Sequence, residues 1–288
     1  MALASHVRMP TSATAPLSPA QRERKWLPTS IQKNFLPWLI PLAVLTLWLC
    51  ATLGGWIDES MLPSPITVAL AAHEQWANGT LWTDIGVSLL RVLIGFGMGM
   101  SAGLLLGTAV GLSQFNHDLL DRSLQMIRTI PHLALVPLVI LWLGIDEAPR
   151  IILVALGTMF PVYINTASGI KNVDAKLLEM GKSYGLNRKE LIWEIIIPGA
   201  MPAILVGIRY ALGVAWLTLV IAETIASRTG IGYMVQNARE LLRIDIIIFA
   251  ILLYALAGWL ADWLIRQIEA KVLRWHPAYA TARRGAAR

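Results

Sequence analysis

Long uncharged stretches alternate with short charged ones along most of the 288-residue chain. A helix needs about 20 apolar residues to cross a bilayer, and several stretches reach or approach that length. The pattern predicts six membrane-spanning helices, at about residues 35–57, 86–111, 129–145, 151–170, 203–226 and 246–266. The third stretch lies at the lower limit of length, so a re-entrant segment is an alternative there. The expected fold is all-α and polytopic.

The segments outside the spans differ in composition. Residues 1–34 are rich in Ala, Ser, Thr, Pro and Arg without a long apolar run, which predicts a flexible tail. A membrane domain is expected over 35–268, followed by a C-terminal tail at 269–288. Between the fourth and fifth spans, residues 171–202 are too long for a simple connector, so we expect structure within them.

Composition and charge exclude several classes of protein. The chain is 56% hydrophobic and 15% charged, whereas a soluble domain carries about 25% charged residues, so a soluble enzyme is excluded. The net charge of +6 does not indicate nucleic-acid binding, because Lys and Arg lie mainly between apolar runs. Eighteen of the 24 fall on the side where six spans place both termini, which predicts a cytoplasmic N-terminus and C-terminus. The single Cys50 excludes an internal disulfide, and neither a metal site nor a cofactor site is expected.

Five glycines recur at every fourth position of the second span. This spacing places all five on one helical face: Gly95, Gly99, Gly103, Gly107 and Gly111. Helices associate in lipid through close packing, and a face without side chains lets a neighbouring backbone approach. We therefore expect tight helix contacts along this stripe.

Ionisable residues inside spans are costly, and the sequence has four: Arg91, Arg209, Glu223 and Asp262. All four lie near span ends, which favours side chains that reach the headgroup region. Arg91 is also a candidate pathway residue, because its positive charge would attract an anion.

Pro161 interrupts the fourth span and is expected to kink or end the helix. A broken helix exposes polar groups to a water-filled path, which makes Tyr163, Asn165 and Thr166 further candidates for the pathway lining. The alternative is that the proline only adapts the helix to its neighbours.

The segment 171–202 reads as two short helices. Asp174 can cap the first, Gly185 ends it, and Asn187 with Glu190 forms a capping-box pattern that starts the second. We expect the second helix to break at the prolines 198 and 202. A helical hairpin on the cytoplasmic side is one interpretation, and an amphipathic segment on the membrane surface is the other.

The tripeptide at 181–183, Gly-Lys-Ser, matches the end of a phosphate-binding loop. That motif needs a glycine at the position of Lys176 and a preceding strand, whereas this tripeptide lies in a predicted helix. The chain is therefore not expected to hydrolyse nucleotide, and any ATP dependence must come from a partner.

Glu179, Gly185 six residues later and the Ile-Ile-Ile-Pro run that ends at Pro198 resemble the EAA motif of permease subunits of bacterial ATP-binding-cassette importers. Met180 and Gly181 stand where that motif has alanines. Further segments resemble the aliphatic sulfonate, taurine and nitrate branch, with aliphatic sulfonate permeases the most similar, over about residues 35–278. They are 62–65 (LPSP), 130–138 (IPHLALVPL), 160–166 (FPVYINT) and 222–224 (AET).

The resemblance implies a type I importer permease fold in the bacterial inner membrane, and a transport subunit rather than an enzyme. It implies a homodimer, two cytoplasmic ATPase subunits that bind ATP and Mg, and a periplasmic substrate-binding protein. It also implies a coupling contact with the ATPase through Glu179, Met180, Gly181, Lys182, Tyr184, Gly185 and Pro198. Aliphatic sulfonates are the expected substrate, with taurine or nitrate as alternatives.

Two other classes of membrane protein fit the sequence less well. An ion-coupled secondary transporter should show inverted repeats or buried coupling carboxylates, and neither is evident in the sequence. A membrane-embedded enzyme would need clustered His, Cys or acidic residues, whereas the five histidines are dispersed.

Overall fold

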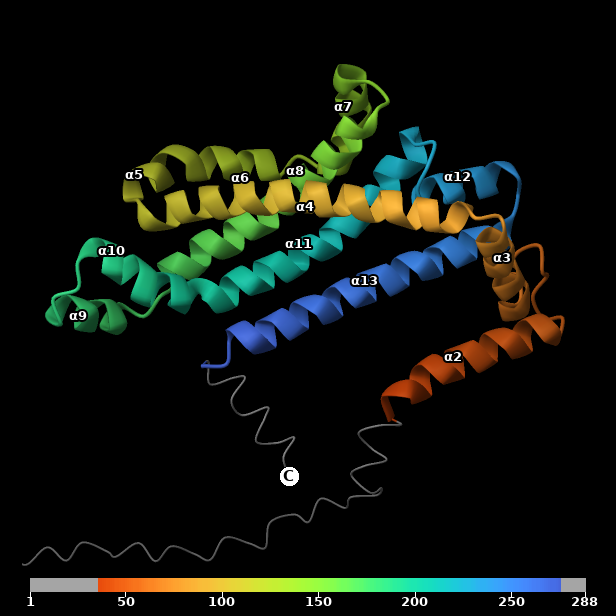
Figure 1. Cartoon of the computed structure of the whole chain (residues 1–288), viewed down its shortest axis with the longest axis horizontal. Coiled ribbons are helices and arrows are strands. Elements are labelled where there is room, and N and C mark those ends of the chain that lie inside the picture. The colour runs from red at the N-terminus through yellow and green to blue at the C-terminus, as the bar shows by residue number, and fades with distance from the viewer. Residues whose placement is uncertain (1–35, 276–288) are drawn as a thin grey trace, which may run out of the picture. The chain divides into compact units, whose positions relative to one another are not determined.

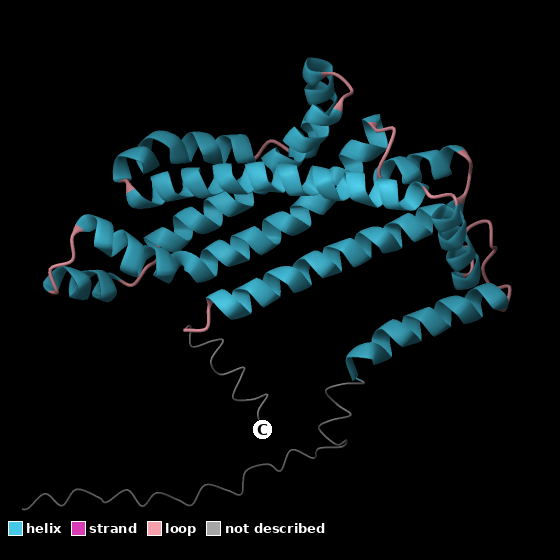
Figure 2. Ribbon diagram, in the orientation of Figure 1, coloured by secondary structure: helices cyan, strands magenta, loops and turns pink. Residues whose placement is uncertain are grey.

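The computed structural model describes residues 36–275, and every regular element among them is a helix (Figure 1). Figure 2 shows helices joined by short loops, without strands in this part of the chain. The all-α prediction is confirmed there. The described residues divide into two units between Ala51 and Thr52, so each unit is described by itself. The predicted tail at 1–34 and the end of the tail at 269–288 lie outside the described residues.

The first unit contains most of α2 (Leu36–Leu53). This 18-residue helix is apolar on all sides and most of its side chains are exposed. At 1.5 Å per residue it is about 27 Å long, close to the thickness of about 30 Å of a bilayer's hydrocarbon core. Its length and surface therefore suit lipid.

The second unit begins with α3 (Pro65–Ala77), whose start is set by local chemistry. The Ser64 side chain accepts a hydrogen bond from the Thr67 N–H at 3.2 Å, and Pro65 occupies a position where no N–H is needed. Gly79 then adopts a left-handed conformation with φ of 75°, which turns the chain into α4 (Thr80–Leu112).

Three long helices form the centre of this unit: α4, α8 (Glu147–Lys171) and α11 (Ile197–Ala226) (Figure 1). The glycine stripe of α4 faces α8. A Cβ atom added at Gly103 would lie 2.6 Å from the Met159 carbonyl oxygen and 2.8 Å from Val162 Cβ. Gly97, on another face of α4, has nothing within 4 Å. The missing side chains thus let the two backbones approach closely.

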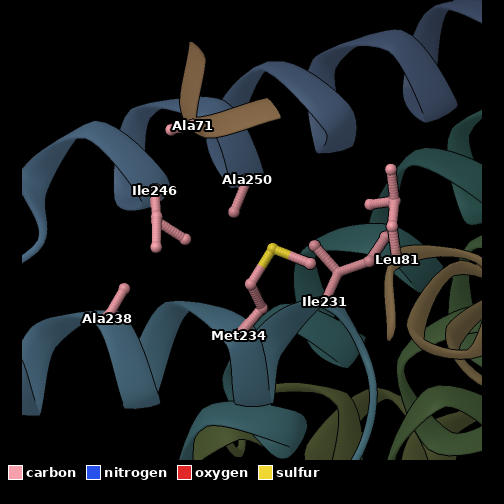
Figure 3. Packing of buried hydrophobic residues seen from close by; sticks show 7 residues of the cluster. All are labelled: Ala71, Leu81, Ile231, Met234, Ala238, Ile246 and Ala250. Carbon is pink, nitrogen blue, oxygen red and sulfur yellow. The ribbon is translucent and has the colours of Figure 1, made fainter. Parts of the chain in front are cut away.

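At one end of this unit, α12 (Ile231–Glu240) meets the start of the long helix α13 (Ile244–Val272). Figure 3 shows the cluster that joins them to α3 and α4. Its buried members are Ala71, Leu81, Ile231, Met234, Ala238, Ile246 and Ala250. Small alanines on α3, α12 and α13 allow these helices to meet around the Met234 side chain.

The third predicted span, 129–145, is not one helix. The short elements α5 (Gln114–Asn116), η1 (His117–Asp121) and α6 (Arg122–Arg128) precede it, and η2 (His132–Leu135) with α7 (Val136–Leu143) makes its apolar part. The helical stretches 114–128 and 132–143 meet at 76°. Pro131 explains the break, because it disfavours a helical conformation in the preceding residue. The pair is one broken span or a re-entrant loop.

The expected break at the prolines 198 and 202 is wrong. The helix that starts at Arg188, with α10 (Arg188–Glu190) and η3 (Leu191–Ile196), continues into α11 without interruption, and Pro202 lies inside α11. The turn before Pro198 is a π-helix, in which the Ile197 N–H donates to the carbonyl of Ile192. This wider turn accommodates the proline ring, which would clash with a carbonyl in a regular α-helix.

Four described helices are long and apolar enough to cross a membrane, and the bent pair raises the number to five. They are α4, residues 188–225, α8 and α13, with α2 as a shorter apolar helix. The prediction of six spans therefore depends on counting α2 and the bent pair as spans.

Candidate functional site

The C-terminal end of α8 leads into a compact hairpin formed by α9 (Ala175–Ser183), α10 and η3. The Asp174 side chain caps α9 by accepting a hydrogen bond from the Lys176 N–H at 2.9 Å. Asn187 and Glu190 form the predicted capping box: the Asn187 side chain accepts from the Glu190 N–H, and the Glu190 carboxylate accepts from the Asn187 N–H. Both predicted helix starts are confirmed.

The turn between the two helices is a Schellman motif. Gly185 has φ of 82°, and the N–H of Leu186 donates to the Gly181 carbonyl at 3.1 Å. Gly181 is buried, and a Cβ there would lie 2.5 Å from Ile195 Cδ1. The small residue at this position allows α9 to pack against the second helix. Gly181 and Lys182 are helical, which is incompatible with a phosphate-binding loop.

The outer surface of the hairpin carries large exposed side chains. Tyr184 is 82% exposed and Met180 50%, and Leu177 and Trp193 are also exposed. Glu179 and Lys182 lie exposed on α9 among them. Exposed apolar groups ringed by charges are typical of a protein-binding surface. Pro198 lies apart from this surface, in the first turn of α11.

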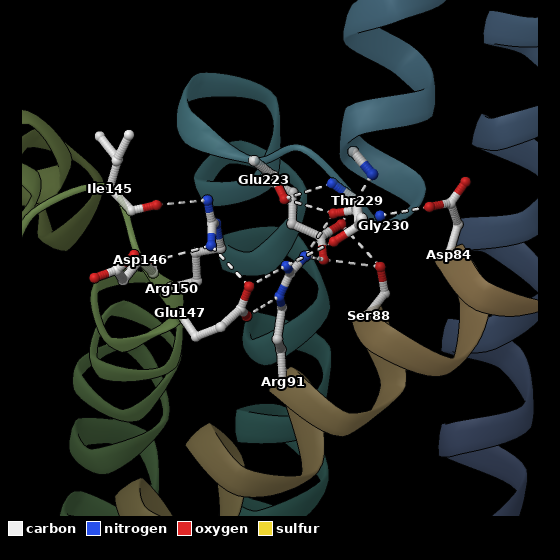
Figure 4. A network of polar contacts seen from close by, with 12 residues as sticks. Asp84, Ser88, Arg91, Ile145, Asp146, Glu147, Arg150, Glu223, Thr229 and Gly230 are labelled. Atoms are coloured by element: carbon white, nitrogen blue, oxygen red, sulfur yellow. Dashed lines mark hydrogen bonds and ion pairs between the residues drawn. The ribbon is translucent and has the colours of Figure 1, made fainter. Parts of the chain in front are cut away.

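A set of polar residues, all buried except Glu147, lies at the opposite end of the same helices, where α4 and α8 begin and α11 ends (Figure 4). We call it the charge cluster, and it consists of Asp84, Ser88, Arg91, Glu147, Arg150 and Glu223. The Arg91 side chain is 2% exposed and bridges two carboxylates. Its Nη1 lies 2.6 Å from Glu223 and its Nε 2.6 Å from Glu147.

Glu223 is fully buried and its carboxylate is extensively hydrogen-bonded. It accepts from the Ser88 hydroxyl at 2.8 Å, from Arg91 and from the Gly232 N–H at 2.9 Å. The Tyr254 hydroxyl lies 3.3 Å away. A buried carboxylate is tolerated because its negative charge is paired and its oxygens are satisfied.

The charge cluster also fixes the connection between α11 and α12. Asp84 accepts from the Gly230 N–H at 2.7 Å, and Ser88 accepts from the Ile231 N–H at 2.9 Å. Gly230 has φ of 110°, and a Cβ there would lie 2.6 Å from a Glu223 oxygen and 2.7 Å from Arg91 Nη1. Only glycine fits this backbone approach.

The expectation that Arg91 and Glu223 reach the headgroup region is wrong, because both are buried and paired with each other. Arg209 pairs with the buried Glu269, and Asp262 pairs with Arg266 on the surface of α13. All four residues lie near span ends, so this position does not predict which of them are buried. The ion pair that each residue forms does.

The four candidate pathway residues do not form one group. Arg91 contacts Glu147 at the start of α8, whereas Tyr163 lies sixteen positions further along, about 24 Å at 1.5 Å per residue. The Tyr163 hydroxyl donates to Asp121 at 2.6 Å, and the Asn165 amide donates to the Pro161 carbonyl. Thr166 is buried against Gly107 of α4.

Sequence reasoning missed most of the charge cluster. A signal was present, since Asp84, Ser88 and Arg91 follow one another at spacings of four and three and continue directly into the glycine stripe. One face of α4 is thus polar at its start and free of side chains further on. The partners Glu147 and Arg150 gave no such signal, because they lie in a short segment between two spans.

Over residues 95–274 the sequence matches the family described as "Binding-protein-dependent transport system inner membrane component". The chain belongs to this family. It is 50% identical over 256 residues to the aliphatic sulfonates transport permease protein SsuC of Escherichia coli (strain K12), covering 89% of this chain and 95% of that protein. Identity to the taurine transport system permease protein TauC of the same strain is 34%, covering 81% of this chain and 86% of that protein.

The fold agrees with that of a solved transporter. An inward-facing structure of the MetNI methionine ABC transporter superposes with a TM-score of 0.54 at 13% identity, covering 66% of this chain and 96% of that chain. The predicted importer permease fold is therefore confirmed. As an inner membrane component of a binding-protein-dependent system, the chain is a transport subunit and not an enzyme.

Proposed function

We propose that this chain forms the translocation path of an ATP-driven importer for small organic anions, with aliphatic sulfonates as substrate. The identity of 50% to an aliphatic sulfonates permease, over nearly the full length of both proteins, is the observation that carries the substrate class. Two copies of the chain would assemble with two cytoplasmic ATPases, which bind ATP and Mg, and with a periplasmic binding protein.

The hairpin of α9, α10 and η3 is the proposed contact with the ATPase. Its helices are capped at both starts and joined by a fixed turn, and the second helix is continuous with α11. A rigid unit of this kind transmits a rigid-body motion of the ATPase to the membrane helices, whereas a flexible loop would deform and leave the helices in place. Tyr184, Met180 and Leu177 would supply apolar contacts, and Glu179 and Lys182 a charged rim.

This assignment puts the hairpin and both termini in the cytoplasm, and the charge cluster on the periplasmic side. The distribution of Lys and Arg supports the same orientation, because the cytoplasmic loops of membrane proteins are rich in them. The five basic residues of segment 171–202 would then lie beside the ATPase. They are Lys171, Lys176, Lys182, Arg188 and Lys189.

The test is co-purification of the chain with its ATPase in detergent, with and without Glu179→Lys. Reversal of the charge on the exposed face of α9 should weaken assembly and reduce stimulation of ATP hydrolysis. Glu240→Lys, an exposed reversal on α12 at the other end of the unit, is the matched control and should leave assembly intact. Normal assembly and stimulation with Glu179→Lys would refute the hairpin contact.

A further inference from the structure

A cavity of about 550 Å³ opens beside the charge cluster, between the start of α8 and the segment that joins α11 to α12. Its polar lining comprises Asp146, Glu147, Arg150, Arg228 and Thr229. Cavities of roughly 300–1,000 Å³ accommodate small molecules in proteins. The size of this cavity and the guanidinium groups that line it suit a small polar molecule.

Arg228 supplies a free positive charge at the rim of the cavity. Its side chain is exposed, and within residues 36–275 no hydrogen bond or ion pair involves it. Thr229 adds a hydroxyl whose oxygen already accepts from Arg91 Nη2 at 3.3 Å. The hydroxyl proton of Thr229 therefore remains available to donate to a ligand. Both groups suit an anion that carries oxygen atoms.

The two carboxylates on Arg91 differ in access to water. Glu223 is fully buried, whereas the Glu147 side chain is 58% exposed and lines the cavity. Glu147 nevertheless takes hydrogen bonds from Arg91 Nε and Nη2 at 2.6 and 2.7 Å, and from Arg150 Nη1 at 3.0 Å. Two buried guanidinium groups are thus covered by one carboxylate that solvent reaches.

We propose that this cavity is an entry site for a small oxyanion, which meets Arg228 first and then replaces the Glu147 carboxylate on Arg91 and Arg150. A sulfonate presents three oxygen acceptors, which suits the paired donors that Arg91 directs at Glu147. Asp146, also at the rim, opposes the anion and keeps the binding weak. Weak binding suits transport, because a ligand must leave as well as enter.

This inference rests on the proposed function, since it places the cavity on the periplasmic side and takes the imported anion as the ligand. Glu147 acts as a built-in competitor that holds Arg91 and Arg150 while the cavity is empty of anion. Glu223 stays in place and keeps the segment between α11 and α12 fixed throughout.

The experiment measures binding of ethanesulfonate, sulfate and nitrate to the full chain, purified in detergent with its ATPase, by calorimetry at low salt. Arg228→Gln should weaken binding about tenfold, because one charged hydrogen bond is lost, and Arg228→Lys should restore part of it. Glu147→Gln should strengthen binding about tenfold, because the competing charge is removed. Arg239→Gln, which removes an exposed arginine of α12 outside the cavity, is the control and should bind like the unmodified chain.

Several results would overturn the inference: no saturable binding of any of the three anions, equal binding by the Arg228→Gln and Arg239→Gln variants, or weaker binding after Glu147→Gln. Uptake by cells separates this failure from failure of the proposed function. If cells take up sulfonate normally and neither Arg228→Gln nor Glu147→Gln alters the uptake, the entry site is refuted and the proposed function stands. Binding of nitrate that depends on Arg228, in a transporter that imports no sulfonate, would retain the site and refute the substrate.

Discussion

Replacing Gly103 with alanine adds one methyl group at a close contact between α4 and α8. The new carbon would lie 2.6 Å from the Met159 carbonyl oxygen and 3.1 Å from the Tyr163 nitrogen, both of which are backbone atoms. Carbon contacts are most favourable at about 3.5–4.0 Å, so α4 and α8 must separate by several tenths of an ångström. Backbone atoms cannot rotate away, and the whole interface has to shift.

Gly97 provides the matched control, because it lies in the same helix with nothing within 4 Å of an added Cβ. Both substitutions gain about 1 kcal/mol of helix propensity, which cancels when the two variants are compared. Overpacking at Gly103 costs about 2 kcal/mol in the free energy of unfolding. For a chain of 288 residues, that difference corresponds to about 3 °C between the two midpoints of thermal unfolding.

Thermal unfolding in detergent, followed by loss of the monodisperse peak in size-exclusion chromatography, measures this difference. The Gly97→Ala variant should unfold at or above the temperature of the unmodified chain, and the Gly103→Ala variant about 3 °C below the Gly97→Ala variant. Equal midpoints for the two variants would refute the argument that the glycine stripe of α4 determines its contact with α8.

Three further predictions concern single interactions. Glu223→Gln removes the buried one of the two carboxylates that neutralise Arg91 and should lower the free energy of unfolding by about 3 kcal/mol; a loss below about 1 kcal/mol would contradict the role of the pair Arg91–Glu223. Asn187→Ala removes a capping box and should cost about 1 kcal/mol, seen as faster amide exchange in the first turn of α10, and unchanged exchange would contradict it. A hydrogen bond from Arg243 holds the pKa of Glu74, outside the spans, below its usual value. The ion pair therefore stabilises the fold at pH values above the pKa that Glu74 has in the unfolded chain, and this stabilisation is lost as the pH falls through the lower pKa of Glu74 in the folded protein. Glu74→Gln should therefore make the melting temperature less sensitive to acid.

The hairpin and the glycine stripe were predictable from the sequence because their signals are local. A capping box involves residues three positions apart, a Schellman turn needs one glycine, and a helical face follows from spacing alone. The positions of Asp174, Gly185 and Asn187 therefore fixed the helix ends of the hairpin before any tertiary contact was considered.

The local rule for proline gave a wrong prediction at Pro198. The rule that proline breaks a helix holds at Pro131, where the chain bends by 76°, but fails at Pro198. There the preceding turn widens into a π-helix and the helix continues, so that the hairpin is directly joined to α11. The sequence carries no simple pattern for such a turn, because it depends on how the helix packs against α9 and α8.

The sequence by itself determined the number and apolar composition of the hydrophobic segments, the caps of the hairpin and the side of α4 that packs against another helix. Only the tertiary structure decided what the intramembrane charges do. Arg91 and Glu223 are 132 positions apart, and Arg91 and Glu147 are 56 apart. Spacing within a helix cannot reveal partners at such separations. The folded bundle brings the starts of α4 and α8 and the end of α11 together, and these charges are tolerated there only because they neutralise one another.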